Sequence, residues 1–141
     1  MTADDLPDAV VFDTEPLVAY FCDEPGGDTV ERYLEAVEGT TDGYVSAVNL
    51  AELRYVVRSL TSGDRAVTVT DVIQQSGIRR VGTADTWETA AAFKHRHSPA
   101  LGDAFALATA RTVDGTLLVG GDDDYDGVTE VPVRKFRDDP G

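Results

Sequence analysis

The sequence contains little cysteine and no long apolar stretch. Cys22 is the only cysteine, which excludes an internal disulfide framework and suits a reducing cytosol. No apolar run approaches the roughly 20 residues that a membrane-spanning helix needs. The first residues, Met1 to Asp8, are acidic and lack the basic-then-apolar order of a secretory signal peptide. From these absences we expect a cytoplasmic protein with no membrane partner.

Positive charge is scarce as well. The chain has 26 acidic and 12 basic residues, a formal net charge of −14, and only two lysines, Lys94 and Lys135. This composition is typical of halophilic proteins, because high ionic strength screens the repulsion between like surface charges. An acidic residue is therefore no sign of a site unless its neighbours make it one. A polyanionic partner would need local basic residues or bridging metal ions to bind.

Short strand-like segments alternate with helix-like segments along the chain. Strands are expected at Ala9–Phe12, Tyr44–Val45, Ile78–Val81, Leu117–Val119 and Val131–Val133. Helices are expected over Leu17–Phe21 and Asp28–Val37, from the cap Ser46 to about Leu60, after the turn Gly63–Asp64 to about Gln75, from Thr83 or Asp85 to His95, and from the cap Ser98 and Pro99 to Ala110. This alternation predicts an α/β fold, with a parallel sheet between two helical layers.

The 141 residues are enough for one domain spanning 1–141, with loose tails at 1–8 and 138–141. In open parallel sheets, binding sites form at the carboxyl ends of the strands. Acidic residues follow two of the expected strands: Asp13 follows the first strand, and Asp122 follows the fourth strand after two glycines. Each has a purely structural alternative. Asp13 could simply cap the next helix, and Asp122 could belong to a solvated acidic turn with Asp123 and Asp124.

Two further acids lie on expected helices. Glu52 has the neighbours Val48, Asn49, Tyr55 and Val56 at helical spacing, a mainly apolar stripe on which a lone carboxylate is costly. The alternative is that Glu52 lies at the edge of the stripe and reaches water. Asp103 has apolar neighbours, but a first-turn aspartate also interacts favourably with the helix dipole, worth about 0.3–1 kcal/mol.

Together these four carboxylates form a pattern that favours a divalent metal ion. Carboxylate oxygens are hard ligands that suit Mg²⁺ or Mn²⁺. Such ions can activate water and neutralise charge on the leaving oxygen of a phosphodiester. The sequence therefore favours a divalent metal site at one edge of the sheet, of a kind that can act on a phosphodiester.

Other residue patterns give weaker indications. His95 and His97 have no cysteine nearby, which argues against a zinc site, and neither a phosphate-binding glycine loop nor a Ser-His-Asp arrangement is present. Trp87 and Phe93 fit helical core spacing better than base stacking. The basic pairs and clusters Arg79–Arg80 and 134–137 could contact phosphate, although pairing with the abundant acids is the simpler interpretation.

Four segments resemble the PIN-domain family, and especially the VapC-type toxins of toxin–antitoxin pairs. They are Val11–Thr14, Ser46–Glu52, Leu101–Ala108 and Gly121–Tyr125, in the family's order. The resemblance implies a three-layer α/β/α fold with about five parallel strands in the order 3-2-1-4-5. It also implies a ribonuclease that forms a homodimer and is inhibited by a small antitoxin protein.

The resemblance assigns roles to individual residues. Asp13, Glu52, Asp103 and Asp122 would hold Mg²⁺ or Mn²⁺ and catalyse RNA cleavage, with Asp124 as an additional metal-binding acid. Thr14, Ser46 and Asn49 would orient the carboxylates or water.

One position departs from the family pattern. Two residues before the fourth acid the family often has Thr or Ser, whereas this chain has Gly120. Gly120 therefore keeps open the alternative of a degenerate PIN domain that binds RNA or protein without cutting. A second alternative, a PIN nuclease in RNA processing or quality control without an antitoxin, stays open independently of this position.

Overall fold

The computed structural model describes residues 6–121 and 124–137. Residues 1–5 and 138–141, which make up most of the two predicted tails, lie outside these ranges, as do Asp122 and Asp123. Pro7 and Asp8 belong to the described part. Their carbonyl oxygens accept hydrogen bonds from Thr41 Oγ1 at 3.1 Å and from Asp42 N at 2.9 Å. Within the described ranges, no helix is both long enough and apolar enough to span a membrane.

Five parallel strands form one sheet in the order β3-β2-β1-β4-β5, which confirms the predicted order. The strands are β1 (Ala9–Phe12), β2 (Asp42–Ser46), β3 (Arg79–Val81), β4 (Thr116–Val119) and β5 (Val133–Lys135). The central strand, β1, and its neighbour β4 are almost entirely apolar and buried. A parallel sheet requires this composition where both of its faces are covered by helices.

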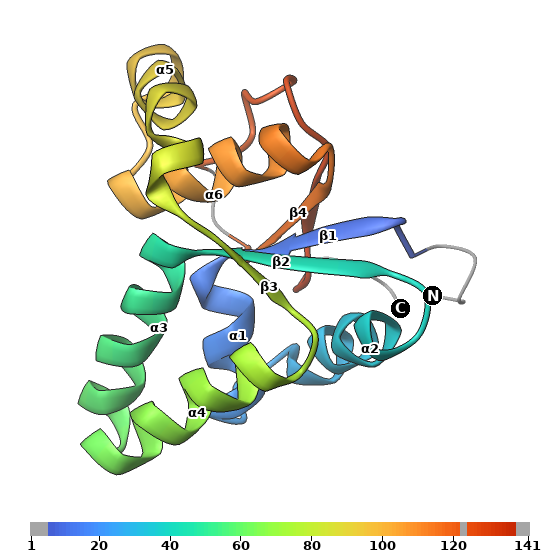
Figure 1. Cartoon of the computed structure of the whole chain (residues 1–141), viewed down its shortest axis with the longest axis vertical. Coiled ribbons are helices and arrows are strands. Elements are labelled where there is room, and N and C mark those ends of the chain that lie inside the picture. The colour runs from blue at the N-terminus through green and yellow to red at the C-terminus, as the bar shows by residue number, and fades with distance from the viewer. Residues whose placement is uncertain (1–5, 122–123, 138–141) are drawn as a thin grey trace.

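Helices cover both faces of the sheet. They are α1 (Thr14–Phe21), α2 (Gly27–Glu38), α3 (Ala47–Leu60), α4 (Gly63–Gln75), α5 (Trp87–His97) and α6 (Leu101–Val113), with a short 3₁₀ turn, η2 (Thr83–Asp85). Figure 1 shows α1 to α4 on one side of the strands and α5 and α6 on the other. The three-layer arrangement is the predicted one.

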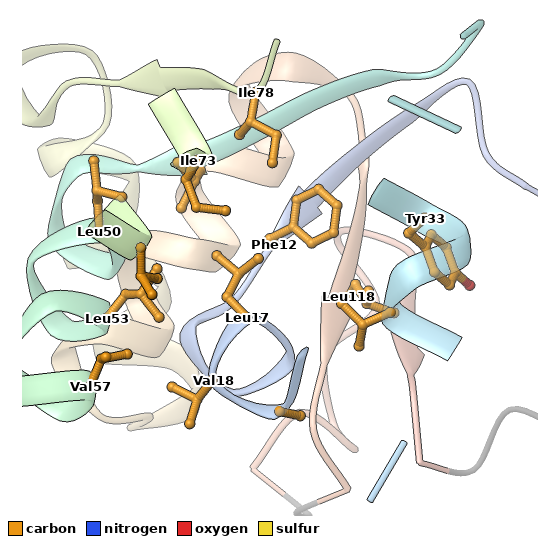
Figure 2. Packing of buried hydrophobic residues seen from close by; sticks show 14 of the residues in the cluster. Phe12, Leu17, Val18, Tyr33, Leu50, Leu53, Val57, Ile73, Ile78 and Leu118 are labelled. Atoms are coloured by element: carbon orange, nitrogen blue, oxygen red, sulfur yellow. The ribbon is translucent and has the colours of Figure 1, made fainter. Parts of the chain in front are cut away.

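Alternate residues of β1 belong to two separate cores. Val10 and Phe12 pack in the cluster beneath α1 to α4, and Val11 packs in the cluster beneath α5 and α6. In the first cluster, Phe12 lies close to Leu17 of α1 and Leu118 of β4 (Figure 2). Because successive side chains of a strand point to opposite faces, one four-residue strand contributes to both layers of packing.

The start of α6 differs from the prediction. Ser98 does not cap this helix: it ends α5 in the left-handed conformation, with φ 54°, and its N–H bonds Lys94 O at 3.0 Å. Pro99 follows because it cannot continue a helix. The helix α6 begins only at Leu101, with Ala100 as its N-cap.

The last strand is also shifted from its predicted place. It runs from Val133 to Lys135 instead of from Val131 to Val133, and it pairs Leu117 with Val133 and Val119 with Lys135. Pro132 has no N–H to donate to the ladder, so only its carbonyl takes part, accepting from Leu117 N at 2.9 Å.

Two smaller differences concern helices α1 and α5. The first begins at Thr14, ahead of the predicted start, because Asp13 caps it and a proline is tolerated in a first helical turn. Trp87 was assigned to the core from its spacing, which is wrong, because it is 57% exposed at the start of α5. Phe93, assigned in the same way, is buried at 1% exposure.

The packing of α3 gives a direct test of the core. Leu53 is fully buried in the first cluster, whereas Leu60 on the same helix is 57% exposed. We expect Leu53→Ala to lower the free energy of unfolding by about 2–5 kcal/mol through loss of apolar contacts and a residual cavity. The matched change Leu60→Ala should cost no more than about 0.5 kcal/mol. Urea unfolding of both variants in concentrated KCl checks this, and equal losses would contradict the assignment of the core.

Candidate active site

The carboxyl ends of β1, β2 and β4 meet at one edge of the sheet, and helices α1 and α3 begin there. Asp13 follows β1 and caps α1, since its Oδ1 accepts a hydrogen bond from Thr14 N at 2.8 Å. Ser46 ends β2 and caps α3, since its Oγ accepts from Asn49 N at 2.9 Å. Asp13 is therefore both a helix cap and a residue of the edge, and the two interpretations made from sequence are compatible.

A pocket of about 240 Å³ lies at this edge. It is lined by Asp13, Thr14, Glu15, Val18, Glu52, Val56 and Asp103. The structure thus brings together three of the four acids singled out from sequence, which come from the end of β1, from α3 and from α6. Asp122 lies outside the described residues, and Asp124 is described but is not among the residues that line the pocket.

Glu52 lies at the edge of the buried stripe of α3 and not within it. The buried residues of this helix are Asn49, Leu50, Leu53 and Val57. Tyr55, counted from sequence as part of the inward stripe, is 59% exposed. Glu52 is half-buried, and its side chain faces the pocket instead of bulk solvent.

The side-chain amide of Asn49 joins the parts of the pocket. Asn49 is fully buried, and its Nδ2 lies 3.0 Å from Glu52 Oε1, 3.4 Å from Asp13 Oδ1 and 3.2 Å from Gly102 O. Thr14 Oγ1 also donates to Glu52 Oε1, at 3.1 Å. The carboxylates of Asp13 and Glu52 are therefore oriented by neutral hydrogen-bond donors, which bring no positive charge into the pocket.

The carboxyl group of Asp13 is buried, and its pKa is raised from 3.8 to about 7. Burial is the largest cause of this rise, like-charge repulsion from Asp103 is the second, and Glu52 adds a smaller contribution of the same sign. The hydrogen bonds from Tyr125 and from the backbone of Thr14 act in the opposite direction but do not cancel the rise. A buried carboxylate beside two others is the environment in which a divalent cation would be strongly stabilising.

Two residues of the site had no assigned role at the level of sequence. Tyr125 OH donates to Asp13 Oδ2 at 2.7 Å, and burial and the nearby Asp13 and Asp103 raise the pKa of this phenol. Glu15 is a further acidic lining residue. Tyr125 is an aromatic residue in an acidic turn and Glu15 is an ordinary first-turn acid, so neither stands out by residue type.

Two glycines leave room for carboxylates of the pocket. A Cβ on Gly102 would overlap the carboxylate of Glu52, and a Cβ on Gly120 would overlap the carboxylate of Glu15. Any larger residue at either position would require the acid to move. The position of each acid therefore depends on the glycine beside it: Glu52 on Gly102, and Glu15 on Gly120.

The donor set of the pocket fits a divalent cation that keeps several waters. Within residues 6–121 and 124–137, no three acidic, histidine or cysteine side chains are placed to enclose a metal ion by themselves. Mg²⁺ and Mn²⁺ do not require such a cage, because they commonly bind through one or two carboxylates, with waters and substrate phosphates as the other ligands. Asp13 and Asp103, both carboxylates facing one open pocket, meet that requirement.

His97 and the C-terminal basic cluster have structural partners. His97 Nε2 lies 2.9 Å from a carboxylate oxygen of Glu130, and neither histidine lines the acidic pocket. Lys135 Nζ lies 2.8 Å from Asp126 Oδ1, and Arg137 pairs with Glu15. Pairing with acids, the simpler interpretation of this basic cluster, is confirmed for these two residues.

The family of the chain follows from comparison with known families. A family model described as the PIN domain matches residues 10–131. The chain belongs to the PIN domain family. The matched range includes every residue that lines the acidic pocket. A comparison with curated proteins gives no match.

Several solved structures share the fold at low sequence identity. VapC20 from Mycobacterium tuberculosis, described as a sarcin–ricin loop cleaving toxin, has a TM-score of 0.70 at 19% identity, over 86% of this chain and 98% of that one. VapBC2 from Rickettsia felis, bound to a promoter DNA fragment, gives 0.68 at 16%, over 90% and 98%. A toxin–antitoxin complex from Klebsiella pneumoniae gives 0.67 at 21%, over 90% and 97%. At these identities the similarity establishes the fold alone.

The raised pKa of Asp13 predicts how the stability of the metal-free PIN domain depends on pH. Between about pH 4 and pH 7 the folded protein holds a proton on Asp13 that the unfolded chain releases. The free energy of unfolding should therefore fall as the pH rises through this window, by on the order of 4 kcal/mol from this group.

Asp13→Asn should remove that part of the pH dependence, whereas Asp71→Asn, at an exposed position on α4, should retain it. Chemical denaturation with chelator present, from pH 4 to pH 8, measures the difference between the two variants. Identical pH dependence in both would mean that Asp13 ionises in the folded protein as it does in an unfolded chain.

Proposed function

We propose that this PIN domain is a metal-dependent endoribonuclease that hydrolyses RNA phosphodiester bonds. Asp13, Glu52, Asp103 and Asp122 would hold Mg²⁺ or Mn²⁺, with Asp124 as an additional acid. The observation that carries the proposal is the carboxyl group of Asp13, buried beside Asp103 and Glu52 in an open pocket at the carboxyl edge of the sheet. Burying like charges together is costly unless a cation or a proton compensates them.

The chemistry needs both an activated water and stabilisation of a leaving oxygen. A divalent ion bound at the carboxylates would supply Lewis-acid activation of water and neutralisation of charge on the phosphate. In the described part of the chain, the hydrogen bonds to Glu52 from Thr14 and Asn49 both go to Oε1. This leaves Oε2 of Glu52 to bind the ion or to accept a proton from water.

Holding these groups in place is the task of neutral side chains in the proposed site. Ser46 Oγ lies 2.5 Å from Asn49 Oδ1, which fixes the amide so that its Nδ2 points to the carboxylates. Tyr125 holds the other oxygen of Asp13. Preorganised donors of this kind lower the cost of assembling the reactive geometry.

Binding RNA to so acidic a protein requires local positive charge, and a second groove, which shares helix α3 with the pocket, supplies it. The groove, of about 530 Å³, lies between α3, α4 and β3 and includes Arg54, Arg58 and Arg80 among its lining residues. Arg54 bonds Thr70 Oγ1 at 2.7 Å, and Arg80 bonds Gln74 Oε1 at 3.2 Å. Within the described ranges, none of these three arginines forms an ion pair with a carboxylate. The groove therefore supports a polyanionic substrate.

We further propose that the chain is the toxin of a type II toxin–antitoxin pair, acting in the cytoplasm as a homodimer and inhibited by a small antitoxin. Support comes from the solved structures of the same fold, whose descriptions name VapC20, VapBC2 and a toxin–antitoxin complex. A PIN nuclease of RNA processing remains the alternative with the same chemistry.

The nuclease proposal is tested with purified protein and labelled tRNA and ribosomal RNA, in concentrated KCl with Mn²⁺, Mg²⁺ or chelator. We expect cleavage only with a metal ion. Glu52→Gln should lower the rate on the order of 10²-fold or more, because the amide keeps the shape but loses the charge. Glu35→Gln, the same change at an exposed position on α2, is the matched control and should leave the rate unchanged.

Cleavage that persists with chelator, or that is equal in the Glu52→Gln and Glu35→Gln proteins, would rule out the proposed site. Intact RNA under every condition would favour the binding-only alternative.

The toxin proposal is tested in cells. We expect induction of the chain alone to arrest growth, and co-expression of a small protein encoded directly upstream to relieve the arrest and to co-purify with the chain. Glu52→Gln should abolish the arrest while still binding that protein. Unaffected growth despite active nuclease in the extract would favour the RNA-processing alternative.

A further inference from the structure

Glu15 is the acidic lining residue of the pocket to which no function has yet been given. It lies in the first turn of α1, two residues after Asp13, and its side chain is 42% exposed. Its carboxylate lines the same pocket as Asp13, Glu52 and Asp103. A first-turn acid could simply face solvent and interact with the helix dipole, but this carboxylate turns to the pocket instead.

Gly120 makes this position of Glu15 possible. The carboxylate of Glu15 lies against the backbone just beyond β4, where a Cβ at position 120 would overlap both of its oxygens and its Cδ. At the next residue, Gly121, an added Cβ would have only an ordinary contact, 3.8 Å from Arg137 Cβ. The room for the carboxylate therefore depends on one glycine and not on a generally open loop.

Arg137 supplies the counter-charge at the rim of the pocket. Its guanidinium pairs with Glu15 Oε1, lies 3.7 Å from Glu24 Oε1 and stacks 4.5 Å from the ring centroid of Phe136. An isolated pair of this exposure contributes little to stability, because water screens the attraction between its charges. That small contribution does not explain why the acid is placed beside three other carboxylates.

We propose that Glu15 is a further carboxylate of the cation site, a positioning residue that orients the bound ion or its water from the room that Gly120 leaves, while Arg137 competes with the ion for it. This inference rests on the proposed metal-dependent function. It can be distinguished from a simple surface ion pair, because it predicts that replacing Glu15 and replacing Arg137 change the metal affinity in opposite directions.

The test is the dissociation constant of Mn²⁺ with the full chain, measured by calorimetry and by the shift in melting temperature, without RNA. We expect Glu15→Gln to weaken binding by about 10-fold or more, as is usual for residues that support a metal site. Arg137→Gln should tighten binding several-fold, because it frees the carboxylate. Gly120→Ala should weaken binding as Glu15→Gln does, because its methyl group displaces the carboxylate, whereas Gly121→Ala should not.

A double variant distinguishes displacement of Glu15 from general damage to the loop. If Gly120→Ala acts through Glu15, the combination Glu15→Gln with Gly120→Ala should be no weaker than either single variant. Unchanged Mn²⁺ affinity in Glu15→Gln, or equal losses in Gly120→Ala and Gly121→Ala, would overturn the inference while the wild-type chain still binds Mn²⁺. A wild-type chain that binds no Mn²⁺ would instead overturn the proposed function, and this inference with it.

Discussion

The burial of one carboxyl group, that of Asp13, constrains how the surrounding elements are placed. Its oxygens accept hydrogen bonds from Thr14 N in α1, from Asn49 in α3 and from Tyr125 in the segment between β4 and β5. A buried carboxylate that lost any of these donors would be left partly unsatisfied, at a cost of about 1–3 kcal/mol or more. The same three bonds therefore hold β1, two helices and a distant loop in register around the pocket.

Small residues are as necessary to this arrangement as the acids. Gly102 admits Glu52, and Gly120 admits Glu15, in each case because a Cβ would occupy the space of the carboxylate. The two glycines come from different elements, α6 and the turn after β4. In both places the absence of a Cβ leaves room for a carboxylate. A residue with a hydroxyl group at position 120 would add a polar atom, but its Cβ would occupy the space that the carboxylate of Glu15 now fills. The departure of this chain from the family pattern at Gly120 thus coincides with the position of the Glu15 carboxylate.

Sequence alone predicted the features that depend on strong local patterns. The apolar runs of β1 and β4 gave their positions, and the acid after β1 lies at the predicted edge of the sheet. Weaker signals failed where tertiary context decided the outcome. Ser98 and Pro99 have the residue types of a helix start but end α5 instead.

The pairing of Glu15 with Gly120 could not be read from sequence, because they are 105 positions apart and each is ordinary by itself. The resemblance drew attention to Gly120 but not to the side chain that fills its space. The two residues come together only in the folded chain, because the pairing of β1 with β4 places the first turn of α1 beside the turn after β4.

In a chain with a net charge of −14, acidity cannot identify the site, but the partners of each acid can. Glu130 and Asp126 contact Arg96 and Lys135, cations that neutralise them. Asp13 and Glu52 instead contact Asn49, Thr14 and Tyr125, which orient a carboxylate without neutralising it. Negative potential therefore persists in the pocket, where a small divalent cation can use it.

Glu15 shares one property with each of these two groups of acids. It lines the pocket as Asp13 and Glu52 do, and it pairs with a cation, Arg137. A cationic partner at the rim limits the repulsion among the acids while no metal ion is bound. The cost of keeping so many carboxylates together is thereby reduced. In the proposed site, a divalent ion would replace the Arg137 guanidinium as the nearest positive charge to Glu15.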